Sequence, residues 1–239
     1  MFYMSPSSMM YWFLFALPGM ILAVWAQARV KKAFNTYSKV HTMQNVTGAQ
    51  VARALLDSQG LYGVDIEPIK GKLTDHYDPR AKILRLSEGV YDQTSIAAAG
   101  IAAHEMGHAL QDDQKYAALG LRSAFVPAAN LGSRTAPILF SIGFMLLFFA
   151  RSSDIGYYVA MGGVLLFGLS VIFTLITLPV EFDASRRAKK LLVSNGILIG
   201  DEIKGVNKVL DAAAWTYVAA AVAAIGQMLY YIALLNRRR

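Results

Sequence analysis

Four long apolar runs stand out along the chain and predict helices that cross a membrane. Three of them lack Asp, Glu, Lys and Arg and reach about the 20 residues that a spanning helix needs: residues 9–28, 155–178 and 212–235. The fourth run, residues 136–150, is short and barely reaches across the hydrocarbon core at about 1.5 Å per residue. We still predict a span there, because the polar residues 151–154 are typical of a tight turn in a helical hairpin.

The N-terminal run is predicted to be an uncleaved transmembrane anchor, residues 1–28. Residues 26–28 resemble a signal-peptidase site after an apolar run. No positive charge precedes that run, however, and Arg29, Lys31 and Lys32 follow it directly, as in a stop-transfer pattern.

The remaining chain is expected to alternate between polar regions and membrane segments. A polar domain of residues 29–134 is followed by a transmembrane hairpin, residues 135–178, and by a second polar segment, residues 179–211. Residues 212–239 form a last helix and a basic tail. Because basic residues flank the membrane next to both polar regions, the positive-inside rule places both in the cytoplasm. Four crossings would put the tail on the opposite side, against that rule.

Within the larger polar region, the pattern predicts a small α+β domain. Residues 47–50 have capping-box spacing and open a helix that Gly60 ends. A helix from residue 96 to about 112 is capped by Ser95 and is rich in alanine and glycine. Between these helices, a turn at residues 78–80 joins two strands into a hairpin of a small antiparallel sheet. The predicted strands cover residues 65–68, 72–77 and 82–86.

Composition agrees with a membrane protein and limits its chemistry. Of the 239 residues, 55% are hydrophobic and 16% are charged, against about 25% charged in soluble domains. The net charge of +7 in such a chain favours anionic lipid over nucleic acid as a partner. The chain has no cysteine, which excludes disulfides, cysteine nucleophiles and thiolate metal sites. Any metal ion must therefore be held by histidine and carboxylate.

The alanine-rich helix contains His104-Glu105-Met106-Gly107-His108, an H-E-x-x-H motif. Residues four apart share one face of a helix, so both imidazoles can bind a single Zn²⁺ ion. Zinc lowers the pKa of a bound water toward 7, and Glu105 between the ligands can act as general base while that water attacks a peptide bond.

A catalytic zinc ion usually takes three protein ligands, so one further ligand is expected. The candidates are the histidines His41 and His76 and the downstream carboxylates Asp112, Asp113, Glu181 and Asp183. We favour Glu181, which follows Pro179, a good first-turn residue of a new helix. Two predicted crossings separate it from the motif, so the chain returns to the same side. Asp183 passes the same test but lies about 200° around the helix, so one of the two carboxylates faces the metal.

Three segments together resemble the YugP-like membrane-bound neutral zinc metallopeptidases: residues 73–79, 95–111 and 178–188. The resemblance implies an integral membrane zinc endopeptidase with a zincin-like domain. The chain is more distantly similar to HtpX-type and CAAX-processing proteases, whose glutamate ligand precedes an aromatic residue as Glu181 precedes Phe182. In those proteins an aspartate four residues after the ligand braces a zinc histidine. Here Ser185 stands at that position, which leaves Ser185, Asp183 and Asp112 as candidates for the brace.

Other polar residues allow a functional and a structural interpretation. His76 is a candidate catalytic donor to an oxyanion, or simply a residue at a strand end near a turn. His41 is interpreted as a solvated surface residue. The cluster Arg186, Arg187, Lys189 and Lys190 is interpreted as a patch for lipid headgroups. We also expect an extended substrate to add along a strand of the hairpin.

The sequence thus predicts an α+β membrane protein with about four transmembrane helices and a cytoplasmic zincin-like domain. Its expected activity is zinc-dependent hydrolysis of a peptide or protein substrate at the lipid bilayer. One alternative is a membrane scaffold or chaperone-type binder with a non-catalytic zinc site, but such sites usually use four protein ligands. A transporter is a third possibility, although charged residues are absent from three of the spans.

Overall fold

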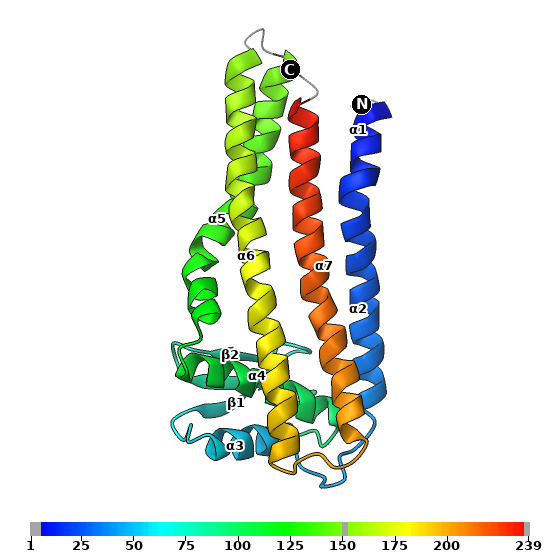
Figure 1. Cartoon of the computed structure of the whole chain (residues 1–239), viewed down its shortest axis with the longest axis vertical. Helices are drawn as coiled ribbons and strands as arrows, with labels where there is room; N and C mark the ends of the chain where they lie inside the picture. The colour runs from blue at the N-terminus through cyan, green and yellow to red at the C-terminus, as the bar shows by residue number, and fades with distance from the viewer. Residues whose placement is uncertain (1–5, 150–152, 237–239) are drawn as a thin grey trace. The chain divides into compact units, whose positions relative to one another are not determined.

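A computed structural model describes residues 6–149 and 153–236 (Figure 1). The basic tail at residues 237–239 and the residues 151 and 152 of the predicted turn lie outside the described residues. The elements are, in order, α1 (Pro6–Tyr11), the π-helical η1 (Trp12–Ala16), α2 (Leu17–Tyr37), α3 (Gly48–Ser58), β1 (Asp65–Ile69), β2 (His76–Asp78), β3 (Ile83–Ser87), α4 (Ile96–Asp113), α5 (Ala117–Phe149), α6 (Ser153–Ser194) and α7 (Glu202–Asn236).

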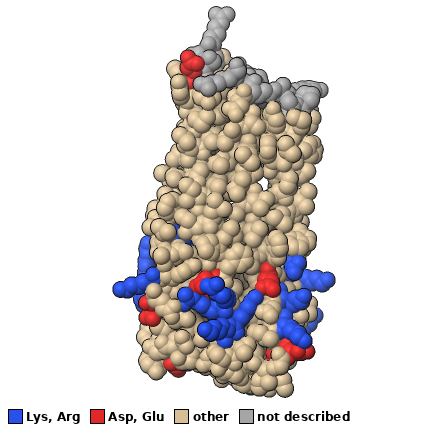
Figure 2. Space-filling view, viewed as in Figure 1, with Lys and Arg blue, Asp and Glu red and all other residues tan. Residues whose placement is uncertain are grey.

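The chain divides into two compact units. Unit 1 comprises Met1–Trp25, Leu121–Leu178 and Thr216–Arg239, and unit 2 comprises Ala26–Gly120 and Pro179–Trp215. Acidic and basic side chains gather on the surface of unit 2 in Figure 2. Unit 2 contains the whole H-E-x-x-H motif and Glu181, so it is the unit that carries the candidate chemistry.

Three helical stretches of the described chain are long and apolar enough to cross a membrane. They are Met9–Tyr37, Asp154–Ser194 and Glu202–Asn236. The fourth predicted span, residues 136–150, is not among them, so by length and composition the described chain has three candidate spans and not the four predicted. Its residues up to Phe149 are only the last part of α5. About 14 residues at 1.5 Å each extend about 21 Å, less than the roughly 30 Å of hydrocarbon, and Arg134 precedes them.

Helices of unit 1 approach each other at small residues. A Cβ atom added at Gly143 of α5 would lie 2.7 Å from the Ala160 Cα of α6. One added at Gly19 of α2 would lie 2.5 Å from the Ala223 Cα of α7. Close backbone contact at glycine and alanine is the usual way in which membrane helices gain packing energy, since lipid offers little hydrophobic drive between them.

Both predicted helices of unit 2 are present, and their caps explain where they begin. In α3 the Gln50 amide N–H donates to Thr47 Oγ1 at 3.2 Å, and the Thr47 N–H donates to Gln50 Oε1 at 2.9 Å, which completes the capping box. Gly60 follows the helix with a φ of 74°, a left-handed conformation that glycine adopts without strain. In α4 the Ala98 N–H donates to Ser95 Oγ at 3.1 Å.

The sheet has the order β1-β3-β2 and is mixed, so the prediction of an antiparallel sheet is wrong for β1. The hairpin is confirmed: β2 and β3 pair antiparallel. The chain reverses between β1 and β2 and again between β2 and β3, so β1 and β3 run the same way and pair in parallel. The second strand in the sequence, β2, is also shorter than predicted and begins at His76. Before it, Leu73 has a φ of 56°, and Asp75 accepts hydrogen bonds from the Ser87 backbone N–H at 2.7 Å and from its hydroxyl.

The core of unit 2 is built around α4. Its alanines and Met106 are buried, and α3, β3, the end of α6 and the start of α7 contribute large buried side chains, among them Leu55, Leu84, Leu192 and Val206. This packing encloses the motif helix and orients its two histidines toward one stretch of α6.

Candidate metal centre

Pro179 does not begin a new helix, contrary to the prediction. It lies inside α6, which continues without a break through the candidate ligand Glu181. Proline lacks an N–H group and so removes one helical hydrogen bond, but it does not end this helix. The nearby Thr177 hydroxyl donates to the Phe173 carbonyl at 2.8 Å and so contributes a bond to the same turns.

The structure brings together His104 and His108 of α4 with Glu181 of α6. His104 Nε2 lies 3.2 Å from Glu181 Oε2, and His108 Nε2 lies 3.5 Å from the same oxygen. The imidazole centroids are 4.9 Å apart and nearly perpendicular, at 87°. One ligand atom from each residue lies within 4.8 Å of the others, so the three could hold one metal ion. The carboxylate at this position is Glu181 and not Asp183.

Each histidine is held on its other nitrogen by a different side chain. His104 Nδ1 lies 3.0 Å from Ser185 Oγ, one turn after Glu181 on α6. His108 Nδ1 lies 3.0 Å from Gln111 Oε1, one turn later on its own helix. Ser185 therefore occupies the bracing position that the sequence left open. In metal sites such partners fix the orientation of the ligand ring.

The two helices approach closely because Gly107 has no side chain. A Cβ atom at this position would lie 2.7 Å from the Ala184 carbonyl oxygen of α6. The predicted role of Gly107 in close packing therefore has a specific partner. This approach lets Glu181 and Ser185, on either side of Ala184, reach the motif.

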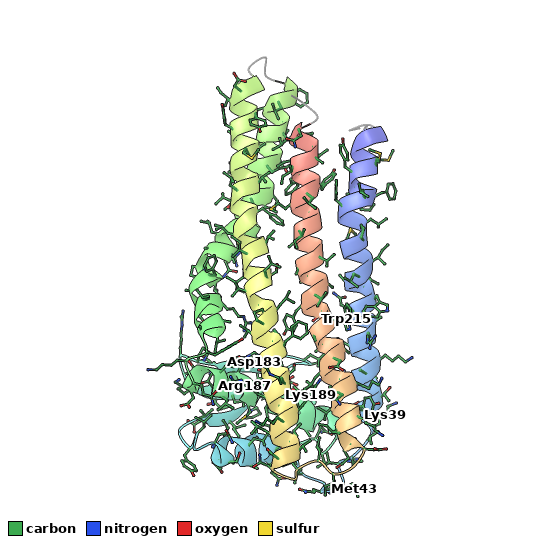
Figure 3. The ribbon with its side chains drawn as sticks, viewed as in Figure 1. Lys39, Met43, Asp183, Arg187, Lys189 and Trp215 are labelled. Atoms are coloured by element: carbon green, nitrogen blue, oxygen red, sulfur yellow. The ribbon has the colours of Figure 1, made fainter. Side chains whose placement is uncertain are left out.

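Asp183 faces a different set of groups from Glu181. Its carboxylate is 5% exposed, accepts from Gln111 Nε2 at 3.0 Å and pairs with Arg186 and Arg187. Asp183 and Arg187 both come from α6 and lie close together in Figure 3. Arg187 also donates to Gln114 Oε1, beyond the end of α4.

Burial and charge act against each other at the motif. Burial alone would lower the pKa of His108, but its hydrogen bond to Glu181 and the negative charges of Glu105 and Glu181 outweigh burial and raise that pKa. The buried carboxylates of the cluster therefore stabilise positive charge beside them, either a proton on a histidine or a bound cation.

Comparison with known proteins gives this cluster a context. A family model described as "Putative neutral zinc metallopeptidase" matches residues 12–236. The chain belongs to this family. It is 50% identical over 218 residues to the protein named "Putative membrane protease YugP" of Bacillus subtilis (strain 168), a match that covers 91% of this chain and 93% of that protein. No solved structure matches the chain.

The donor set fits the zinc ion that the metallopeptidase family implies. Two imidazoles and one carboxylate are ligands of catalytic zinc, and three protein ligands leave a fourth position for water or substrate. Glu105, between the histidines, is 9% exposed and lies on the same helix about 60° from His108.

The remaining candidates lie outside the three-residue cluster. His76 Nδ1 lies 2.9 Å from the Thr74 carbonyl, at the start of β2. His41 Nδ1 lies 2.7 Å from Thr94 Oγ1, so it is tied to the loop before α4. Asp112 accepts from the Tyr77 hydroxyl at 2.8 Å and does not brace a histidine in the described contacts.

Two features were not recognised in the sequence. Gln111 ends the segment 95–111 that resembles the zinc metallopeptidases, but no role was predicted for it. Its position three residues after His108 places it where it can contact that ring. Most of the basic cluster that the sequence predicts to be a lipid patch is also paired within the protein: two arginines bind Asp183, and Lys189 binds Asp211 at 2.6 Å. Acidic residues at suitable helical spacing, Asp183 among them, were the available signal.

Proposed function

We propose that this chain is a multi-pass membrane zinc endopeptidase whose site lies in unit 2. The observation that supports it best is the convergence of His104, His108 and Glu181 beside Glu105, in a member of a zinc metallopeptidase family. We assign the first three residues as zinc ligands and Glu105 as the general base.

In this proposal, each residue of the site has a separate task. Zinc, when bound, supplies Lewis-acid polarisation of the scissile carbonyl and makes water easier to deprotonate. Glu105 takes the proton from the attacking water and passes it to the leaving amine nitrogen. Ser185 and Gln111 hold the histidine rings, and the buried Glu181 carboxylate compensates part of the positive charge.

His76 remains a candidate for stabilising the oxyanion, with one chemical condition. Its Nδ1 faces a carbonyl oxygen, which can only accept, so Nδ1 carries the hydrogen. In a neutral ring Nε2 is then an acceptor. His76 could therefore donate through Nε2 to an oxyanion only as an imidazolium.

The proposed substrate is an extended peptide or protein segment. The strand β3 already pairs on both sides, so it cannot take a further strand. Of the predicted hairpin, β2 has an edge without a partner in the described sheet, and it contacts α4. A substrate that adds to β2 would lie next to the motif helix.

We further propose that both segments of unit 2, residues 26–120 and 179–215, lie on the cytoplasmic side of the cell membrane, which requires that the chain go out and return within residues 121–178 of unit 1. The proposal is supported by the basic residues that follow two of the uncharged apolar runs. Arg29, Lys31 and Lys32 follow residues 9–28, and a basic cluster that includes Lys190 follows residues 155–178. The name of the Bacillus relative, "Putative membrane protease YugP", agrees with a membrane location.

Replacement of Glu105 by glutamine is the direct test. Glu105→Gln keeps the shape of the side chain but removes the base, so we expect zinc content near that of the wild type and peptide cleavage reduced about 10²–10⁴-fold. Purified protein in detergent would be assayed for metal content and for cleavage of a peptide library. Full cleavage by this variant would contradict the role of Glu105.

The main alternative is a scaffold or binder with a non-catalytic zinc site. Structural zinc sites usually have four protein ligands, and the described cluster offers three. A wild-type protein that binds zinc but cleaves no peptide in the library would favour this alternative.

A further inference from the structure

Gln111 connects a histidine of the candidate centre to a buried carboxylate of the next helix. It is fully buried, with 0% of its surface exposed, and its Oε1 lies 3.0 Å from His108 Nδ1. Its Nε2 donates to two acceptors of α6, the Val180 carbonyl at 2.8 Å and Asp183 Oδ2 at 3.0 Å. All polar groups of this amide are thus used.

These partners determine which way the amide of Gln111 points. A backbone carbonyl and an ionised carboxylate can only accept hydrogen bonds, so the amide nitrogen must face Val180 and Asp183. The amide oxygen then faces His108, and because this oxygen only accepts, His108 Nδ1 must carry the hydrogen. In the neutral ring, the form that binds a metal ion, the other nitrogen, Nε2, then has the lone pair, and it is the atom that lies 3.5 Å from Glu181 Oε2.

Asp183 is itself fixed by its surroundings. Its buried carboxylate pairs with Arg186 and Arg187, which favours the ionised, purely accepting form. Arg187 is held in turn by Gln114 and lies 5.7 Å from the centroid of the Tyr116 ring. His104 differs, because its partner Ser185 has a hydroxyl that can either donate or accept and so imposes no tautomer.

We propose that Gln111 and Asp183 form a positioning relay that sets the tautomer and orientation of His108 for binding a metal ion. This inference rests on the proposed function, since it assumes that the cluster binds zinc. Neither residue is a ligand in it: Asp183 acts through Gln111, and Gln111 acts through His108.

Removal of the amide is the first test. Gln111→Leu keeps a side chain of similar size but takes away the acceptor for His108 Nδ1. We expect zinc affinity to fall about 10–100-fold, as is typical when the partner of a ligand histidine is lost. Affinity would be measured on the full chain in detergent by competition with a chromogenic chelator. The visible spectrum of the Co²⁺-loaded protein should change as well, which a purely structural role would not cause.

An exchanged pair keeps the test decisive if Gln111→Leu folds poorly. Gln111→Glu alone places two carboxylates together and should weaken zinc binding. Combined with Asp183→Asn, it restores an acceptor facing His108 and a donor facing the other oxygen of residue 111, with the same net charge. The Val180 carbonyl then loses its donor, so we expect part of the lost affinity to return. Asp211→Asn is the matched control, because Asp211 also pairs with a cation of α6, Lys189, at 2.6 Å but does not contact the relay. We expect its zinc affinity to stay unchanged.

Three results would overturn the relay while leaving the proposed function intact. These are wild-type zinc affinity in Gln111→Leu, no recovery in the exchanged pair, and lower stability of the metal-free protein with unchanged affinity and Co²⁺ spectrum. A wild-type protein that binds no zinc would overturn both proposals. Zinc binding without peptide cleavage would contradict the proposed function alone, because the relay is measured by metal affinity.

Discussion

Gly107 lies between Glu105 and His108 of the motif and faces Ala184 of the neighbouring helix α6. Because it has no side chain, the two helices can approach closely at this point. The atoms nearest to a Cβ placed at residue 107 belong to the Ala184 backbone, its oxygen at 2.7 Å and its Cα at 3.1 Å. Backbone atoms cannot move aside as a flexible side chain does, so the contact limits the size of residue 107. The histidines and Glu181 therefore depend on this glycine for their distance.

We expect Gly107→Ala to push α4 and α6 apart. Overpacking of this kind costs about 1–3 kcal/mol, and the displaced Glu181 should also weaken zinc binding. Chelator competition and thermal unfolding of the purified protein would measure both effects. Gly120→Ala is the control, since a Cβ there would meet no atom within 4 Å beyond its chain neighbours and the nearby backbone of its own helix. Equal zinc affinity and stability in the two variants would contradict this prediction.

At the residue scale, the sequence predicts those groups whose geometry is local. His104, Glu105 and His108 lie within two turns of one helix, so their spacing alone gives their relation. The sequence favours Glu181 over Asp183, and Glu181 does lie beside the histidines, although Pro179 does not begin a helix there. The partners of Asp183 were not predicted. Contacts between Gln111 and Asp183 join positions 72 residues apart, and no periodicity within one helix predicts them.

Among the elements, β2 is linked to α4 by a side-chain hydrogen bond from Tyr77. The Tyr77 hydroxyl donates to Asp112 Oδ2 at 2.8 Å, and Lys82 pairs with the same carboxylate. Burial, followed by the hydrogen bond to Asp112 and nearby negative charge, raises the pKa of Tyr77 well above its usual value. The neutral phenol is therefore the form that the folded protein stabilises.

This raised pKa predicts a loss of stability at alkaline pH. Below about pH 10, the tyrosine is neutral in both the folded and the unfolded chain, and its contribution is fully present. Above that pH the unfolded chain releases the proton first, so the free energy of unfolding falls as pH rises. We expect Tyr77→Phe to be about 1 kcal/mol less stable than the wild type near neutral pH and to lose less stability above about pH 10. Denaturant unfolding over this range would test it, and parallel curves for the two proteins would contradict it.

At this scale the helices were easier to predict than the sheet. The ends of α3 and α4 depend on neighbouring residues, Thr47 with Gln50 and Ser95 with Ala98, so the sequence identifies them. The parallel pairing of β1 depends on which edge of β3 is free, and this is a non-local property. Strands of three to five residues also carry too little alternation to fix their ends.

For the whole molecule, the absence of cysteine allows the proposed orientation to be tested by labelling. Tyr62 of unit 2 is 74% exposed, so Tyr62→Cys introduces a single reactive thiol at its surface. A cytoplasmic unit 2 predicts that a membrane-impermeant maleimide labels this thiol in inside-out vesicles and not in intact cells. Exposed Met43 of the same unit, as Met43→Cys, should behave alike. Labelling of either variant in intact cells would contradict the orientation.

Metal binding should also connect segments that are distant in the chain, since 77 residues separate His104 of α4 from Glu181 of α6. A ligand that binds only the folded state stabilises it by about 2.7 kcal/mol at a free concentration 100 times its Kd. For a chain of this size, each kcal/mol corresponds to about 2–4 °C in Tm. Zinc should therefore raise the Tm of the wild type clearly, and chelation should reverse the effect. Glu181→Gln should lose most of this response, whereas Glu67→Gln, which changes an exposed carboxylate of β1, should keep it. If zinc raised the Tm of Glu181→Gln as much as that of the wild type, α6 would not contribute a ligand, and the metal would be bound by α4 alone or elsewhere in the chain.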